Sequence, residues 1–270
     1  MLLVRYHPAT EARSTRDWSV LSPDLPHVDW VLALIFVALL AFLAWRARRK
    51  DRREYQRFKR YRSTVRRQAM YRKWLRESFI VFGSLAVILL ALVWQFVPLV
   101  IRDVNGWDWV RPVRDWYAAF GWPATAVLVF IVVVLPIALL FLARKQDDVT
   151  SIGDIQAMLP RNRAEVRLGA LLSLNAGVVE ELLFRLALPA LLLGAFGNTL
   201  FALVVSALVF GSLHAYQGVV GIIGTMIVGV FLLAIYLATG SILVAIIVHV
   251  LIDLRSFVFI PLIVLRVPKV

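Results

Sequence analysis

The chain has 270 residues, of which 61% are hydrophobic and 17% are charged, and its mean hydropathy is +0.79. A soluble domain averages about 45–50% apolar and about 25% charged residues, so one globular core cannot bury this excess. The composition excludes a soluble enzyme, a disordered chain and a disulfide scaffold, and the absence of cysteine excludes thiolate nucleophiles. The sequence therefore predicts an all-α polytopic transmembrane helix bundle of about seven spans, with eight as the alternative count.

The chain begins with a polar tail, residues 1–27, in which Arg5, His7 and Pro8 interrupt any apolar core, so we expect no cleaved signal peptide. The predicted spans are residues 28–45, 78–101, 123–143, 168–193, 200–216, 218–238 and 241–265. Two membrane domains follow from this division: residues 28–143 with three spans, and residues 144–270 with the remaining four. In the second domain, Asn162 and Glu165 have the spacing of a helix start.

The basic residues are concentrated between the first two spans. Residues 46–76 hold 15 of the 30 Lys and Arg residues against two acids, so this loop alone accounts for the formal net charge of +13. The positive-inside rule places such a loop in the cytoplasm and the N-terminus outside, and we expect no nucleic-acid partner. Helical spacing within the loop relates Tyr55, Phe58, Arg62, Val65 and Ala69. This spacing favours a basic amphipathic helix that lies on anionic lipid of the bilayer.

Ionisable side chains are rare in the later spans. Between residues 168 and 254 they are Glu180, Glu181, Arg185, His214, His249 and Asp253. Each costs about 2.5–3.5 kcal/mol at the centre of a lone membrane helix on insertion scales, so the six must face one another or a water-filled cavity. A polar network that only holds the helices together is one interpretation. A catalytic or transport site is favoured, because three helices each contribute groups of acid–base chemistry.

The first helix of this set carries two adjacent carboxylates. Glu181 and Arg185 are four residues apart and share a helix face, which predicts an ion pair. Glu180 points about 100° away from Glu181, so it remains free to act as a general base.

The two histidines lie on later helices. His249 and Asp253 are also four residues apart, so the carboxylate could orient the imidazole. Phe210 precedes His214 by one turn and would give that ring an apolar wall.

Three motifs resemble those of one known family. Residues 180–185, EELLFR, resemble its EExxxR motif; residues 210–214, FGSLH, its FxxxH motif; and residues 249–253, HVLID, its HxxxN/D motif. Their order on successive hydrophobic helices resembles the CPBP family of intramembrane proteases. That family includes the type II CAAX prenyl endopeptidases and the bacterial Abi, or bacteriocin-immunity, proteins. The resemblance covers roughly residues 150–260, so residues 144–270 would form the catalytic membrane domain.

The resemblance implies a site for peptide-bond hydrolysis inside the membrane. The residues that match Glu180 and His214 would activate a water molecule. Those that match His249 and Asp253 would stabilise the oxyanion. The supporting residues would be Glu181, Arg185 and Phe210.

Two features of the motifs bear on the chemistry. Glu180, His214 and His249 could hold one divalent metal ion such as zinc, but the chain has no H-E-x-x-H helix, which slightly favours a metal-free, glutamate-type mechanism over a metalloprotease. Asp253 stands where other members have Asn, and an ionised carboxylate is a poor donor to an oxyanion.

The predicted function is that of an intramembrane endopeptidase, a peptide hydrolase with a membrane protein or peptide as substrate, in a bacterial cell membrane. The first alternative is a non-catalytic immunity or scaffold membrane protein of the same fold. The second is a proton-coupled transporter, which the absence of paired broken helices disfavours.

Overall fold

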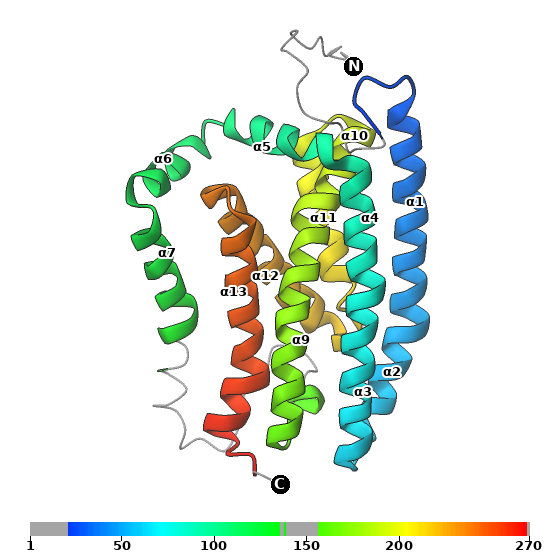
Figure 1. Cartoon of the computed structure of the whole chain (residues 1–270), viewed down its shortest axis with the longest axis vertical. Coiled ribbons are helices and arrows are strands. Elements are labelled where there is room, and N and C mark those ends of the chain that lie inside the picture. The colour runs from blue at the N-terminus through cyan, green and yellow to red at the C-terminus, as the bar shows by residue number, and fades with distance from the viewer. Residues whose placement is uncertain (1–20, 136–137, 139–155, 269–270) are drawn as a thin grey trace.

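The structure is a computed structural model that describes residues 21–135, 138 and 156–268 (Figure 1). These residues form helices and turns and no strand, so the all-α prediction is confirmed. The helices of the first half are α1 (Val28–Arg46), α2 (Arg52–Lys59), α3 (Thr64–Glu77), α4 (Ser84–Val93), α5 (Val97–Asn105), α6 (Arg111–Phe120) and α7 (Trp122–Val129). Those of the second half are α9 (Arg163–Glu181), α10 (Leu188–Phe196), α11 (Thr199–Ser212), α12 (Gly218–Thr239) and α13 (Ile242–Leu254).

Short π-helical and 3-10 segments join many of these helices into longer rods. The π-helical segments are η1 (Ala47–Asp51), η2 (Ser78–Gly83), η4 (Phe130–Val134), η6 (Leu182–Ala187) and η8 (Arg255–Val264). The 3-10 segments are η3 (Trp94–Phe96), η5 (Gln156–Met158) and η7 (Ala215–Gln217).

Four stretches are long and apolar enough to cross a membrane: Val28–Lys59, Thr64–Asn105, Ala215–Thr239 and Ile242–Val264. They are consistent with an integral membrane protein, but they do not amount to the seven predicted spans. The predicted fourth span is part of one helical rod, α9–η6–α10, in which ionisable residues interrupt the apolar sequence. The fifth, α11, has only 14 residues. The third, 123–143, lies partly outside the described residues.

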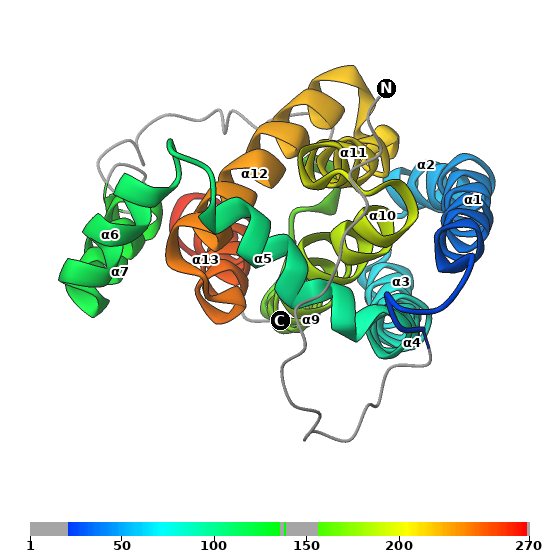
Figure 2. The same ribbon diagram turned by 90° about the horizontal axis from the view of Figure 1, so that it is seen from above.

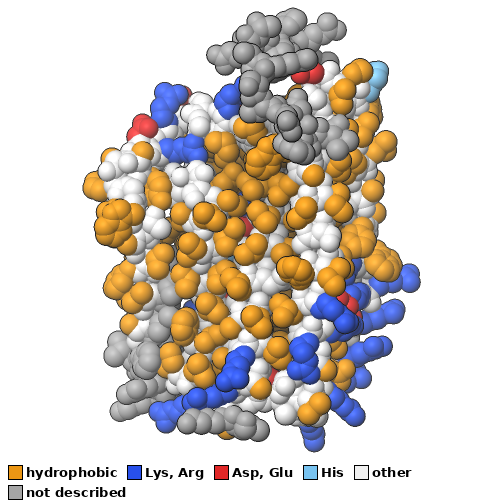
Figure 3. Space-filling model, viewed as in Figure 1, with side chains coloured by type: hydrophobic (Ala, Val, Ile, Leu, Met, Phe, Trp, Pro, Cys, Tyr) orange, Lys and Arg blue, Asp and Glu red, His pale blue; other side chains and the backbone are white. Residues whose placement is uncertain are grey.

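Side-chain types are sorted along the long axis of the molecule. Apolar side chains cover its middle, and Lys and Arg side chains gather at the lower end (Figure 3). The beginning of α1 lies at the upper end, and the last described residues lie at the lower end (Figure 1). This is the distribution that the positive-inside rule gives for a protein whose lower end faces the cytoplasm.

The basic loop 46–76 is a helical hairpin, and the prediction of one amphipathic helix on the lipid surface is wrong. The rod α1–η1–α2 and the rod that starts with α3 both continue into it, with a turn at residues 60–63 (Figure 1). Tyr55 and Phe58, expected to face lipid, are 1% and 0% exposed because they pack within the protein. Val65, by contrast, is 69% exposed. The predicted period holds only within α2, where the apolar face covers a neighbouring part of the same chain, and the turn at residues 60–63 interrupts it before Val65.

A fully buried salt bridge joins this hairpin to α9. The Arg67 Nε donates to Glu165 Oε2 over 3.0 Å, and both side chains are 0% exposed. The guanidinium also donates to the carbonyl oxygens of Ala157 and Leu159, at 2.9 and 3.0 Å. The Asn162 side chain accepts from the Glu165 backbone N–H, as the predicted helix start requires. The first turn of α9 is thereby fixed against the basic hairpin.

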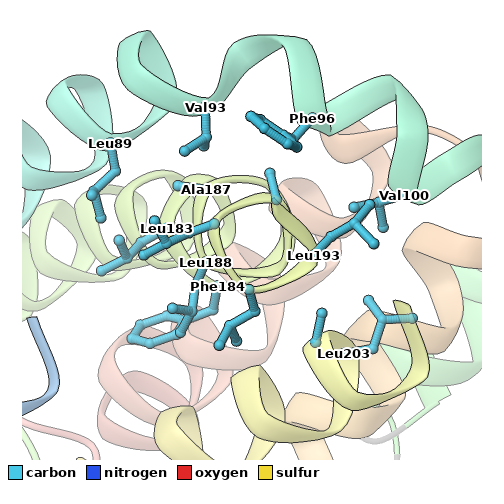
Figure 4. Close-up of a cluster of buried hydrophobic side chains, with 14 of the residues drawn as sticks. Leu89, Val93, Phe96, Val100, Leu183, Phe184, Ala187, Leu188, Leu193 and Leu203 are labelled. Carbon is cyan, nitrogen blue, oxygen red and sulfur yellow. The ribbon is translucent and has the colours of Figure 1, made fainter. Parts of the chain in front are cut away.

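Helix α10 lies in the middle of the bundle, between α1, α4, α5 and α11 (Figure 2). Its residues are apolar on every side, as expected of a helix without a lipid or water face, and Leu188 and Leu191 are 0% exposed. Leu89 and Val93 of α4 pack on this rod from one side (Figure 4). This core holds in place the helical rod that also carries the candidate site.

Candidate active site

The site begins where α9 and α13 come very close together. A Cβ atom at Gly177 would lie 2.5 Å from the Val250 Cγ2 atom and 3.1 Å from the Val250 backbone nitrogen. Only glycine permits this approach of the two backbones. One turn further along α9, the approach puts Glu181 opposite His249.

Glu181 is the centre of the buried polar cluster. Its Oε1 lies 2.6 Å from Nδ1 of His249, and its Oε2 lies 3.1 Å from Nε of Arg185. An ionised carboxylate can only accept hydrogen bonds, so Nδ1 of His249 is the donor. The predicted ion pair with Arg185 is present. The expectation that Asp253 orients His249 is wrong, because that hydrogen bond comes from Glu181, on another helix.

Arg185 lies in the π-helical segment η6, just before Pro189. A proline has no N–H for the carbonyl four residues earlier, and its ring crowds that carbonyl, which accounts for a wider turn at this place. The guanidinium is 3% exposed; its Nη2 donates to the Gly229 carbonyl over 3.1 Å, and it lies 4.6 Å from the Phe210 ring centroid. Arg185 thus links α9, α11 and α12.

Two further carboxylates flank the other ring nitrogen of His249. Nε2 lies 3.9 Å from Glu180 Oε2 and 4.0 Å from Asp253 Oδ2. The Glu180 and Asp253 side chains are 28% and 29% exposed, whereas that of Glu181 is 0% exposed. The cluster therefore has a closed side, at Glu181, and an open side, at Glu180 and Asp253.

His214 follows the end of α11. Its Nδ1 lies 3.0 Å from the Phe210 carbonyl oxygen, so in a neutral ring Nδ1 donates and Nε2 is left as an acceptor. The Phe210 ring contacts both imidazoles, with centroids 5.1 Å from His214 and 6.3 Å from His249, as the predicted apolar wall requires. His214 is also close enough to Asp253 for that charge to act on it. The structure brings Glu180, His249 and Asp253 together, and His214 adjoins them.

The arrangement does not match a metal centre. Across the described ranges, no three His, Asp or Glu side chains group as ligands of one ion. The set suggested by the sequence, Glu180, His214 and His249, is thus not placed as a ligand set, and we assign no chemical step to a metal.

Sequence reasoning missed two contributors to this site. Gly177 stands four residues before Glu181, and a small residue at that spacing on a polar helix face is a signal of close helix packing. Tyr216 follows His214 by two residues, and its ring centroid lies 6.0 Å from that of His214. Nothing in its spacing distinguishes it from the other interfacial aromatic residues.

Long apolar helices around a buried cluster of glutamate, arginine and histidine indicate a membrane protein with a polar site inside its helices. Residues 162–255 match the family model described as Type II CAAX prenyl endopeptidase Rce1-like. This match confirms the CPBP resemblance for that part of the chain, and all six ionisable residues of the spans lie within it. Similarity to this family suggests an intramembrane protease. Neither the curated proteins nor the solved structures give a match to the chain.

Proposed function

We propose that the protein is an intramembrane endopeptidase that hydrolyses a peptide bond with a water molecule activated by Glu180 and His214. One observation carries the proposal: a half-open cluster in which Nε2 of His249 lies 3.9 Å from Glu180 and 4.0 Å from Asp253. Perturbed acid–base groups that converge beside an accessible space are typical of catalytic sites.

The reaction needs a base, a nucleophile and a proton donor for the leaving amine. The oxygen of water bonds to the carbonyl carbon of the peptide while Glu180 takes one of its protons. The acceptor nitrogen of His214, left free by the Phe210 carbonyl bond, holds the water in line. Cleavage of the C–N bond then transfers the proton from Glu180 to the amine nitrogen. The products are one carboxyl group and one amino group.

The buried residues Glu181 and Arg185 hold His249 in position for the exposed carboxylates. Glu181 fixes the ring of His249 through Nδ1, so that Nε2 points to Glu180 and Asp253. Arg185 neutralises Glu181 and joins it to Gly229 and Phe210. A ring held in this way keeps its geometry when a substrate binds.

The proposed topology places the basic hairpin in the cytoplasm and the N-terminus outside. The Lys and Arg residues of the lower end support it (Figure 3). The substrate would be a membrane protein or a peptide that reaches the cluster from the bilayer.

The test is an assay of the purified protein on a fluorogenic peptide library in detergent. We expect Glu180→Gln to abolish turnover while the variant keeps its melting temperature. Asp108→Asn is the matched control, because that carboxylate is 96% exposed on a connection remote from the cluster. Turnover by Glu180→Gln equal to that of the control would contradict the enzyme and favour the scaffold protein. Loss of turnover with a chelator, reversed by a divalent ion, would contradict the metal-free mechanism.

A further inference from the structure

Tyr216 joins the candidate site to the basic hairpin. It lies in η7, between α11 and α12, and its ring centroid is 6.0 Å from that of His214 and 5.3 Å from that of Tyr55 in α2. Its ring also packs in the apolar cluster that includes Phe257, which stands one turn after Asp253. The ring therefore has one aromatic neighbour in the candidate site, His214, and one in the basic hairpin, Tyr55.

The hydroxyl of Tyr216 accepts one hydrogen bond, and its own proton remains available for donation. The side-chain Nε2 of Gln217 donates to the Tyr216 oxygen over 2.9 Å. A phenol can accept and donate at once, and an amide nitrogen can only donate. Within the part of the chain that the structure describes, no acceptor takes the Tyr216 proton.

The site is short of donors for the negative charge that develops on the carbonyl oxygen during hydrolysis. Asp253 and Glu180 are carboxylates, which accept when ionised. Arg185 is 3% exposed, with its Nη1 fully covered, so it cannot reach a substrate. Nδ1 of His214 and Nδ1 of His249 are engaged by the Phe210 carbonyl and by Glu181. The Tyr216 hydroxyl keeps a proton to donate, and Nε2 of His249 donates only when that ring is protonated, because its Nδ1 already donates to Glu181.

We propose that the Tyr216 hydroxyl donates a hydrogen bond to the carbonyl oxygen of the scissile peptide and is a catalytic residue of this protein. The inference rests on the proposed hydrolysis. The Tyr216 ring centroid lies 6.0 Å from that of His214, and Tyr216 is near enough to Glu180 and Asp253 for their charges to act on it. It supplies the donor that Asp253 cannot supply as a carboxylate.

The first test is Tyr216→Phe, which keeps the ring and its contacts with His214 and Tyr55 and removes the hydroxyl alone. We expect kcat to fall about a hundredfold, the scale for loss of one oxyanion donor, with KM and the melting temperature unchanged. The matched control is Tyr117→Phe, because the Tyr117 hydroxyl of α6 forms a 2.6 Å hydrogen bond with Thr125 of α7, outside the candidate site. Its kcat should equal that of the unchanged protein.

A second variant, Gln217→Leu, removes the amide that orients the hydroxyl. We expect a smaller fall in kcat, about fivefold to tenfold, again without a change in KM. A Tyr216→Phe variant with kcat within twofold of the control would overturn the proposal, and so would a raised KM at constant kcat. Glu180→Gln in the same assay separates the two proposals. If Glu180→Gln is inactive and Tyr216→Phe is fully active, only the role of Tyr216 fails. If Glu180→Gln remains active, the proposed hydrolysis fails.

Discussion

Glu181 and His249 are 68 positions apart in the sequence, yet a 2.6 Å hydrogen bond joins them inside the bundle. The second oxygen of Glu181 is 3.1 Å from Arg185, so one carboxylate serves a cation and an imidazole together. Residues that share a buried charge cannot be changed one at a time without leaving another charge uncompensated.

Removal of Arg185 should therefore be more harmful than removal of the whole pair. We expect Arg185→Ala to destabilise the protein by about 3–5 kcal/mol, because Glu181 would stay buried without its cation. The folded yield and the melting temperature in detergent measure this effect. The double variant Glu181→Gln with Arg185→Met should recover much of the loss. A double variant as unstable as Arg185→Ala would show that the pair is not coupled.

A second buried pair should anchor the basic hairpin. Glu165→Gln leaves the guanidinium of Arg67 without its counter-charge at a position with no exposure, and the cost should be several kcal/mol. Arg66→Gln changes the charge on an exposed neighbour and serves as the control. We expect the hairpin to become sensitive to trypsin in Glu165→Gln and to resist it in Arg66→Gln. Equal digestion of both would contradict an anchoring role.

The sequence was sufficient to find the ionisable residues of the buried cluster but not the contacts among them. Helical spacing predicted the Glu181–Arg185 pair correctly, because both partners lie on one helix. The same argument paired His249 with Asp253, and there it was wrong about orientation, since Glu181 of another helix provides the hydrogen bond. Contacts between helices depend on rotation and distance of their axes, which a single sequence does not contain.

For the basic hairpin, too, the sequence predicted the local structure but not the contacts with other segments. Its charge predicts which side of the membrane it faces, and its apolar spacing predicts a helix. In the structure Tyr55 and Phe58 pack against Tyr71 of the next helix and against Met158, about 100 residues later in the sequence. These partners decide that the two rings cover protein and not lipid. The apolar pattern is the same in both cases.

Close contact at Gly177 should be required for the site. Gly177→Ala puts a methyl group 2.5 Å from Val250 Cγ2 and 3.1 Å from the Val250 backbone, so α9 and α13 must move apart. The Glu181–His249 bond would lengthen, and we expect turnover to fall at least tenfold with a lower melting temperature. Gly83→Ala is a matched control, because its nearest contact would be an ordinary 3.8 Å. If Gly177→Ala had the same turnover and melting temperature as Gly83→Ala, close contact of α9 and α13 at this position would not be required.

The proposed topology can be tested with single cysteines, since the chain contains none of its own. Ser63 lies in the exposed turn between α2 and α3, at the basic end, and Asp108 lies on the connection between α5 and α6, at the other end (Figure 1).

In intact cells, a membrane-impermeant thiol reagent applied outside should label Asp108→Cys and not Ser63→Cys. After the membrane is permeabilised, both should react, which controls for exposure of each thiol. The reason is electrostatic: the 15 Lys and Arg residues of the hairpin are retained on the cytoplasmic side, whereas the connection at Asp108 carries both signs of charge and several tryptophans typical of an interface. Labelling of Ser63→Cys from outside, with Asp108→Cys protected, would contradict the proposed orientation and place the basic hairpin outside.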